Sequence, residues 1–392
     1  MHGLQASLLG LTAVSTALYL TMVTAFVVAM ARHRPPPNPH HRPRVSILKP
    51  LAGIDDELEQ NLASFAELDY PDYEILLGVA SPDDRAYPIA REFAERAGHH
   101  RARLIVTDAD AAINRKVAQL LALEQAASGD LVVVSDSNVR VGPGYLKCIV
   151  AELASPGVAC VSSVFAGSGE RTLGAALENL QLNAFNAPAV AAAFTLGHTI
   201  TVGKSMAMWR DALRRIGGFS SVADFLSEDH LLGRAFARAG YAVRVSLSPV
   251  DNRNVSGSVE RMIARHTRWA QIRCALSPLT FALEPALSPL VIATLAFLAL
   301  PVMPLSLSLV GALAVQACGA VITSSVLRRQ APRWYWLPLE ALRSYLLFFC
   351  WLRACASRRV AWRGYVFQLA RDTRIVPCET DARDRVHGVA RA

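Results

Sequence analysis

The sequence predicts an α/β protein in which one cytosolic domain with a doubly wound sheet lies between membrane-spanning segments. Between residues 45 and 278, short apolar stretches typical of buried strands alternate with stretches of helical periodicity. Long apolar runs lie on both sides of this region. The composition agrees, because 52% of the 392 residues are hydrophobic and only 18% are charged, as expected when part of a chain lies in lipid.

The first apolar run, residues 4–30, predicts an N-terminal membrane anchor. It is longer than the roughly 20 residues that cross a bilayer, and it lacks the basic start and the cleavage site of a removed signal peptide. Basic residues follow directly, so the positive-inside rule places the chain from residue 32 onward in the cytoplasm. Residues 1–31 are therefore expected to be a signal anchor, and residues 32–44 a Pro-rich, basic tether close to the lipid headgroups.

The C-terminal part, residues 279–392, is expected to return to the membrane and to end in a basic tail. Residues 287–305 and 307–327 are each long and apolar enough to span a bilayer. Residues 336–355 are also apolar but contain charged side chains, so a re-entrant or interfacial helix is expected there.

Residues 45–278 are expected to form the cytosolic domain, a length that one α/β domain can fill. Its strands are expected at residues 45–51, 74–79, 103–106, 131–134, 158–165, 200–209 and 241–247. Its helices are expected at residues 55–68, 89–97, 114–127, 173–183, 230–239 and 259–274. The seven Cys residues lie at none of the spacings that bind metal, so free thiols in a reducing compartment are expected.

Carboxylates stand where the predicted strands end and helices begin. Asp136 follows the apolar strand at residues 131–134, and ligands of open α/β sheets bind beyond the carboxyl ends of the strands. Asp83-Asp84 follows another strand, and Glu228-Asp229 begins a helix. A turn or a helix cap would explain each of these singly. Their order along one chain, followed by a basic helix, points instead to a ligand site.

This order resembles that of processive-type glycosyltransferases, which have three separated aspartates and a (Q/R)-x-x-R-W box. It resembles the ceramide glucosyltransferases, glycosyltransferase family 21, more closely still. The similarity covers about 230 residues, roughly 45 to 275. The matching motifs are Leu48-Lys49-Pro50-Leu51 with Gly53, Leu68-Asp69-Tyr70-Pro71, Asp136-Ser137 with Val139-Arg140-Val141, Glu228-Asp229, and Arg265-His266-Thr267-Arg268-Trp269.

The resemblance implies a Rossmann-like, nucleotide-sugar-binding fold of the GT-A type and a membrane-bound, inverting enzyme. It implies transfer of a hexose, glucose being the family default, from a UDP-sugar to the primary hydroxyl of ceramide. Its partners are then the nucleotide sugar, the lipid acceptor and the membrane, with no nucleic acid. We expect an integral protein of the bacterial inner (cytoplasmic) membrane, with its catalytic domain facing the cytoplasm.

By the same resemblance, Asp229 is the catalytic base. Attack by an alcohol on an anomeric carbon needs a carboxylate that accepts the hydroxyl proton. Asp136 is expected to bind Mg²⁺ or Mn²⁺, which would neutralise the donor's diphosphate. The motif here is D-S-N where many nucleotide-sugar enzymes have D-x-D, so Asn138 offers a carbonyl oxygen to the metal but no charge.

The remaining expected site residues bind the donor. The resemblance places Asp84 or Asp83 at the nucleoside and Lys116 near the nucleoside or the phosphate. A capped turn is the alternative for the two aspartates.

The R-x-x-R-W box lies on one predicted helix, where residues three and four apart share a face. Arg265 and Arg268 suit the leaving diphosphate, and the indole of Trp269 can stack on the acceptor or the sugar. A basic helix that lies on anionic lipid is the alternative.

The identity of the lipid acceptor stays open, because Ala187-Pro188 stands where animal relatives have His-Pro.

The sequence also leaves alternatives for the function. One alternative is a hopanoid glycosyltransferase, although the bacterial relatives of that kind favour D-S-D and H-x-x-R-W. Another is a processive polysaccharide synthase, which usually has Q-x-x-R-W and more spans. A third is a non-catalytic membrane scaffold that keeps the fold.

Overall fold

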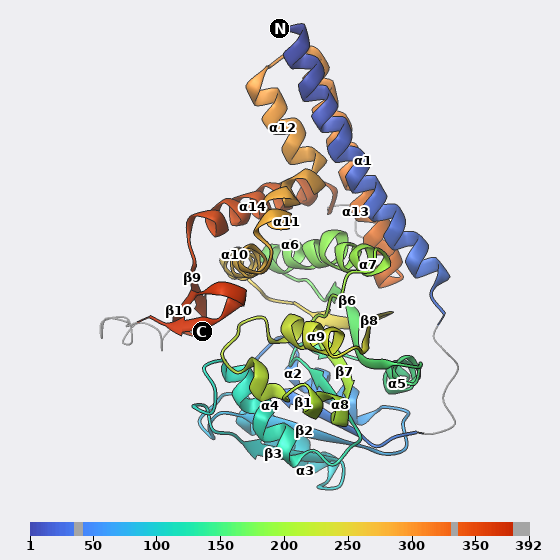
Figure 1. Cartoon of the computed structure of the whole chain (residues 1–392), viewed down its shortest axis with the longest axis vertical. Coiled ribbons are helices and arrows are strands. Elements are labelled where there is room, and N and C mark those ends of the chain that lie inside the picture. The colour runs from blue at the N-terminus through green and yellow to red at the C-terminus, as the bar shows by residue number, and fades with distance from the viewer. Residues whose placement is uncertain (35–41, 331–335, 379–392) are drawn as a thin grey trace. The chain divides into compact units, whose positions relative to one another are not determined.

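The computed structural model describes residues 1–34, 42–330 and 336–378 (Figure 1). Residues 35–41 of the predicted tether, and the part of the predicted basic tail from residue 379 onward, lie outside the described residues. The chain forms two compact units, which we call the sheet unit and the helical unit. The sheet unit comprises residues 29–169 and 190–255, and the helical unit comprises residues 1–28, 170–189 and 256–392.

The boundaries expected for the cytosolic domain, after residues 44 and 278, stay a prediction. The two units divide the chain at other positions, because α6 (Leu173–Gln181) and α10 (Val259–Leu276) pack against α14 (Trp336–Ala356) within the helical unit.

The sheet unit is built around an eight-stranded sheet, in the order β3-β2-β1-β4-β7-β6-β8-β5 among the described residues. Strands β1 to β4 pair in parallel, whereas β7 pairs antiparallel with β4 and β6, and β5 antiparallel with β8. The predicted α/β class is confirmed; the doubly wound, parallel arrangement holds for β1 to β4, and the sheet is mixed beyond them. The strands are β1 (Val45–Pro50), β2 (Tyr73–Val79), β3 (Ala102–Val106), β4 (Leu131–Ser135), β5 (Val139–Arg140), β6 (Val158–Ser168), β7 (Ser205–Trp209) and β8 (Ala242–Arg253).

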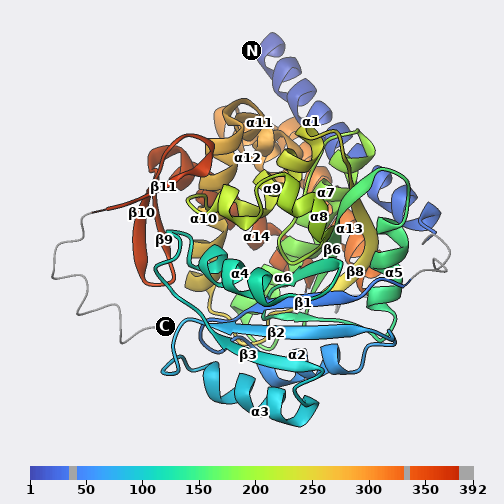
Figure 2. The same cartoon turned by 60° about the horizontal axis from the view of Figure 1, so that its bottom comes forward.

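Helices connect the parallel strands and cover the sheet. Figure 2 shows β1, β2 and β3 side by side, and α2 packs against α3. The helices of this unit are α2 (Leu58–Ala66), α3 (Tyr87–Ala97), α4 (Arg115–Ala126), α5 (Tyr145–Leu153), α8 (Arg210–Arg215), the short η2 (Phe219–Val222) and α9 (Glu228–Arg238), while α7 (Ala187–Thr195) begins in the helical unit.

The central strands are buried on both faces, which explains their continuous apolar sequences. Leu48 of β1, Leu76 of β2 and Val132 of β4 are fully buried and share one core cluster with Leu123 of α4. A Cβ added at Gly78 of β2 would lie only 3.1 Å from Cδ1 of Leu123, so α4 packs closely on the sheet at this position. This packing fixes the place of the first turn of α4, where a predicted site residue lies.

The helical unit consists of helices and a small antiparallel sheet of three strands in the described residues. Its further elements are α1 (His2–Arg32, whose end lies in the sheet unit), the π-helix η1 (Leu182–Asn186), α11 (Pro278–Leu283), η3 (Glu284–Leu287), α12 (Pro289–Ala299), α13 (Met303–Arg328), β9 (Arg359–Trp362), β10 (Tyr365–Leu369), η4 (Arg371–Thr373) and β11 (Ile375–Pro377).

Two helices among the described residues, α1 and α13, are long and apolar enough to cross a membrane. They run side by side (Figure 1), and the hydroxyl of Tyr19 donates a hydrogen bond of 3.0 Å to the carbonyl oxygen of Gln316. The segments predicted at residues 4–30 and 307–327 are therefore confirmed as helices of membrane-crossing length.

The span predicted at residues 287–305 is not one straight helix. α12 has 11 residues and is about 16 Å long, whereas the hydrocarbon core is about 30 Å thick. Residues 278–287 and 289–299 form a pair bent by 80°, which is a broken span or a re-entrant loop. Pro301 accounts for the helix end, since its ring disfavours a helical backbone at Leu300, which is extended.

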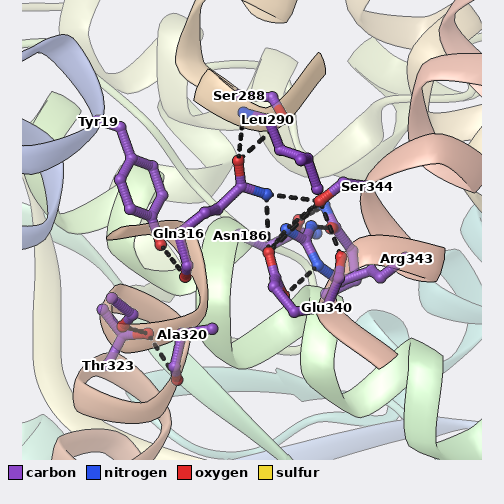
Figure 3. Close-up of polar contacts among 12 residues, drawn as sticks. Tyr19, Asn186, Ser288, Leu290, Gln316, Ala320, Thr323, Glu340, Arg343 and Ser344 are labelled. Carbon is purple, nitrogen blue, oxygen red and sulfur yellow. Dashed lines mark hydrogen bonds and ion pairs between the residues drawn. The ribbon is translucent and has the colours of Figure 1, made fainter. Parts of the chain in front are cut away.

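Helix α14 buries two charged side chains, Glu340 and Arg343, which are 1% and 5% exposed. Arg343 Nε donates to Glu340 Oε2 at 2.8 Å, and Nε2 of Gln316 from α13 donates to Glu340 Oε1 at 2.8 Å (Figure 3). Arg343 also donates to Gln181 of α6, and Gln316 to Ser344. The cost of burying these charges is offset by their partners. The predicted re-entrant or interfacial position of this helix stays a prediction.

Candidate functional site

Four segments of the sheet unit bring charged side chains to one place. They are the carboxyl end of β4 with Asp136, the first turn of α4 with Lys116, the residue before β7, Lys204, and the first turn of α9 with Glu228 and Asp229. Three of these residues, Asp136, Lys116 and Asp229, were expected from the sequence to belong to the site.

The end of β4 delivers Asp136 because its four preceding residues are buried in the sheet. The antiparallel register pairs Ser135 of β4 with Ser205 of β7, which places Asp136 beside Lys204. The backbone N–H of Asp136 donates to the carbonyl of Lys204 at 3.3 Å. Lys204 Nζ then lies 3.1 Å from Asp136 Oδ2.

Asn114 fixes the first turn of α4. As the N-cap, its Oδ1 accepts hydrogen bonds from the N–H groups of Lys116 and Val117, at 3.0 and 3.2 Å. Its Nδ2 donates at 2.7 Å to the carbonyl of Phe225, just before α9. Asn114 is fully buried, so it joins the starts of the two helices that carry Lys116 and Glu228.

Lys116 connects the carboxylates of β4 and α9. Its Nζ lies 2.9 Å from Asp136 Oδ1 and 2.9 Å from Glu228 Oε1. Burial by itself lowers the pKa of Lys116, but the two carboxylates raise it above its usual value. Burial likewise raises the pKa of Asp136, yet Lys116 and Lys204 together hold it well below its usual range. Both groups are therefore charged at neutral pH.

Asp229 is held by backbone N–H groups. Its Oδ2 accepts from Gly203 at 2.6 Å and its Oδ1 from His230 at 2.7 Å. Burial raises the pKa of Asp229 and of its neighbour Glu228, and the charge of Lys116 opposes the rise. A carboxylate with a raised pKa and a fixed orientation is suited to accept a proton.

Lys49 of β1 lies beneath this cluster and is fully buried. Its Nζ donates to the carbonyl of Asp136 at 2.9 Å and to Ser135 Oγ at 3.3 Å, and it lies 3.8 Å from the ring centre of Phe65. Burial lowers the pKa of Lys49 to about 7.

Asn138 and Asp136 offer oxygens that converge on one cation. Asn138 Oδ1 accepts from Lys204 Nζ at 3.0 Å, and the same nitrogen lies 3.1 Å from Asp136 Oδ2. One carboxylate and one amide oxygen are ligands that Mg²⁺ or Mn²⁺ accepts when phosphates complete the shell. The pair therefore fits a divalent ion at the place that the ammonium holds. The described residues contain no group of three or more His, Cys, Asp or Glu side chains arranged to hold a metal.

The two aspartates expected at the nucleoside differ in their contacts, because only the carboxylate of Asp84 accepts hydrogen bonds from the backbone. Asp84 Oδ1 accepts from the N–H groups of Gly53 and Ala86, at 2.9 and 2.8 Å. Asp83 is exposed, and its N–H donates to Ser81 Oγ at 3.1 Å. Asp84 thus fixes the loop after β1 and the start of α3, and Asp83 is accessible to a ligand.

In the helical unit, the predicted arginine box lies on α10, as expected. Arg265 Nη1 lies 3.1 Å from Glu178 Oε1 of α6, and His266 Nε2 lies 3.3 Å from Glu178 Oε2. Burial by itself raises the pKa of Glu178, but the positive charge of Arg265 contributes to lowering that pKa to about 2. The ring of Trp269 meets that of His266 edge-on, with centroids 5.1 Å apart.

Arg268 lies among like charges. Burial, followed by the charges of Arg265 and of Arg363 in the β9–β10 turn, lowers the pKa of Arg268 to about 10. The carboxylate of Glu178, which pairs with Arg265, opposes this lowering. Such a cluster favours an anion.

Sequence reasoning assigned no role to Lys204, Glu228, Glu178 or Arg363. Lys204 and Glu178 meet the expected site residues through long-range pairing, for which no local pattern exists. Arg363 lies in a hairpin that the sequence analysis placed in the C-terminal membrane region. Glu228 lies in the Glu228-Asp229 motif, so the expected role of Asp229 could have drawn attention to Glu228 as well.

Comparison with known proteins supports the expected family. The model of glycosyl transferase family 21 matches residues 8–375. Ceramide glucosyltransferase 1 of Caenorhabditis elegans is 28% identical over 273 residues, which cover 69% of this chain and 58% of that protein. Ceramide glucosyltransferase 3 of the same organism is 27% identical over 270 residues, covering 68% and 59%. The chain thus matches less than two thirds of the length of either relative.

A solved structure supports the fold. The mannosyltransferase PcManGT from Pyrobaculum calidifontis, in complex with GDP-Man and Mn²⁺, superposes with a TM-score of 0.51 at 21% identity, covering 89% of this chain and 99% of that one. The fold is of the GT-A type, as predicted. Because the family model matches most of the sequence, the chain belongs to glycosyl transferase family 21.

Proposed function

We propose that this chain is an inverting glycosyltransferase of the bacterial inner (cytoplasmic) membrane that transfers a hexose, glucose by preference, from a UDP-sugar to the primary hydroxyl of ceramide. The observation that carries the proposal is the arrangement of Asp229 beside the Lys116–Asp136 pair, with a carboxylate held for proton transfer and ammonium groups next to it. Family membership and the ceramide glucosyltransferases among the relatives support the choice of acceptor.

Asp229 acts as the general base in this proposal. The acceptor oxygen attacks the anomeric carbon, the bond from that carbon to the diphosphate oxygen breaks, and UDP leaves with the electron pair. The hydroxyl proton passes to the carboxylate of Asp229, whose raised pKa matches that role. A single displacement inverts the anomeric configuration.

The donor's negative charge needs counter-charges. Mg²⁺ or Mn²⁺ bound by Asp136 and Asn138 with the phosphates would supply one of them. Lys116 and the arginines Arg265 and Arg268 supply others, since guanidinium groups form paired hydrogen bonds with phosphate oxygens.

The remaining contacts of the proposal are with the uridine and the acceptor. Asp83 or Asp84 contacts the nucleoside, and Trp269 stacks on the sugar or the acceptor. The catalytic domain, residues 45–278, faces the cytoplasm, where UDP-sugars are made.

The test is an assay of the purified full chain in lipid nanodiscs. Each of UDP-glucose, UDP-galactose, UDP-glucuronate and UDP-N-acetylglucosamine is offered with ceramide or with a hopanoid alcohol, and mass spectrometry identifies the products. We expect glucosylceramide, and we expect Asp229→Asn to lower its rate about 10²-fold or more. A hopanoid product would overturn the acceptor, and equal rates for the variant and the wild type would overturn the role of Asp229.

A further inference from the structure

We propose that Lys204 is a built-in counter-ion of the donor site, which competes with the divalent ion for Asp136 and Asn138 and lets a nucleoside diphosphate bind without metal. This inference rests on the proposed function, because it concerns the same donor site. It predicts a protein whose nucleotide binding tolerates chelation of metal.

The geometry carries the first step. Lys204 Nζ is 3.1 Å from Asp136 Oδ2 and 3.0 Å from Asn138 Oδ1, so both oxygens of the D-x-N motif point at one nitrogen. A magnesium ion would take oxygens at about 2.1 Å from the same side. The ammonium and the metal cannot occupy this place together, and binding of one displaces the other.

The position of Lys204 is built into the sheet. It directly precedes β7, whose register with β4 pairs Ser205 with Ser135. Its side chain is 14% exposed. Asn138 is 6% exposed, and its carbonyl accepts from the N–H of Arg253 at 2.8 Å. The contact between Lys204 and Asn138 is therefore made by two largely buried side chains.

The charges also match. A D-x-D motif presents two carboxylates, which balance a divalent ion. Here the second position is the neutral Asn138, so the motif has one negative charge, and one ammonium balances it. The other ammonium that contacts Asp136, that of Lys116, is also paired with Glu228. The neutral Asn138 at the second position of the motif therefore fits the presence of Lys204, because an ammonium in this place needs less negative charge around it than a divalent ion does.

A diphosphate that enters this site meets two ammonium groups. Lysine binds phosphate as a point charge on a flexible stem, so Lys116 and Lys204 can turn from Asp136 to the phosphate oxygens. Without metal, Lys204 remains as the second counter-charge. With Mg²⁺ or Mn²⁺ present, Asp136 and Asn138 would hold the ion, and the ammonium of Lys204 would be left to bind the phosphates.

The experiment measures the binding of UDP and of Mn²⁺ rather than turnover. Isothermal titration with UDP is carried out on the full chain in nanodiscs, once in EDTA and once in Mn²⁺. Electron paramagnetic resonance of Mn²⁺ then counts bound ions without nucleotide. The variants are Lys204→Met, Lys204→Met with Asn138→Asp, and the control Lys147→Met, which removes a lysine from an ion pair with Asp69 near the surface.

We expect the wild type and Lys147→Met to bind UDP in EDTA within about tenfold of their affinity in Mn²⁺, a difference of about 1.4 kcal/mol. Lys204→Met should lose at least about tenfold more affinity in EDTA but bind UDP in Mn²⁺, which also shows that it is folded. The double variant should bind Mn²⁺ more tightly than the wild type in the absence of nucleotide.

Each other outcome is decisive. If the wild type binds UDP only in Mn²⁺, or if Lys204→Met matches the wild type in EDTA, the inference is overturned while the proposed function stands. If the wild type binds UDP under neither condition, both are overturned.

Discussion

Lys116 Nζ lies 2.9 Å from Oε1 of Glu228, so a residue in the first turn of α4 holds the first turn of α9. The two residues are 112 positions apart in the sequence, as their numbers show. The same nitrogen contacts Asp136. One lysine thus joins the strand that carries the expected metal ligand to the helix that carries the expected base.

Lys116→Met should weaken both the fold and nucleotide binding. It leaves two partly buried carboxylates without their shared cation, and breaking a buried ion pair costs about 3–5 kcal/mol. We expect a lower unfolding temperature and a UDP affinity reduced by at least about tenfold, measured by thermal unfolding and titration calorimetry. Lys147→Met is the matched control, because exposed pairs contribute only about 0–1 kcal/mol. A variant as stable as this control would contradict the structural role of Lys116.

The rate of transfer should depend on pH through the Glu228–Asp229 pair. Burial raises the pKa of both carboxyl groups, and only the ionised form of Asp229 accepts a proton. The value of kcat/KM should therefore rise with pH, with a midpoint above the ordinary carboxyl value of about 4. In Asp229→Asn this rise should disappear from the residual rate. A wild-type midpoint at or below about 4 would show that burial does not govern the base.

Arg268→Lys should slow the reaction although it keeps the charge. A lysine cannot form the paired hydrogen bonds of a guanidinium with phosphate, so we expect kcat/KM to fall about tenfold or more. Arg261→Lys, an exposed position on the same helix, is the control and should leave kcat/KM within twofold, about 0.4 kcal/mol. Equal losses in the two variants would point to a general effect of α10 on the membrane surface.

Glu74 should stabilise the sheet unit in a pH-dependent way. Burial by itself raises its pKa, but hydrogen bonds from Ser128 and Ser46 and the ion pair with Arg103 lower it from 4.5 to about 2. A pKa lowered on folding adds stability above the unfolded value, and that stability is lost as the pH falls through about 4 to about 2.

Glu74→Gln should therefore lower the free energy of unfolding by about 3 kcal/mol at pH 7, and the difference should shrink below pH 4. Chemical denaturation at a series of pH values measures it. Glu95→Gln, in an exposed pair with Arg91, should change little at any pH. A constant difference for Glu74→Gln from pH 7 to pH 3 would contradict the assignment.

The elements of the sheet unit that the sequence predicted have local signals, whereas β5, α5 and α8 were not predicted. Residues 131–134 are apolar without alternation, and β4 (Leu131–Ser135) is buried on both faces. The helix after Asn114 was expected from its opening residues, and Asn114 is its N-cap. In both cases one short stretch contains the whole signal.

What the sequence did not predict depends on pairing between distant segments. The antiparallel position of β7 beside β4 decides that Lys204 meets Asp136, and no periodicity in either strand encodes that register. The pairing of Glu178 with Arg265 has the same origin. The segment predicted to span at residues 287–305 is not one straight helix for a local reason, because Pro301 disfavours a helical backbone at Leu300 and hydropathy does not register that effect.

Chemical labelling of the buried Lys49 can report local opening of the sheet unit. The amine of Lys49 has its lowered pKa only while it is buried, and in that state it is fully enclosed between β1, β4 and the ring of Phe65, out of reach of acylating reagents. The rate at which Lys49 is labelled therefore measures how often β1 separates from its neighbours. A nucleotide that tightens the end of β4 will protect this single lysine, and peptide mass mapping can follow that protection without any assay of turnover.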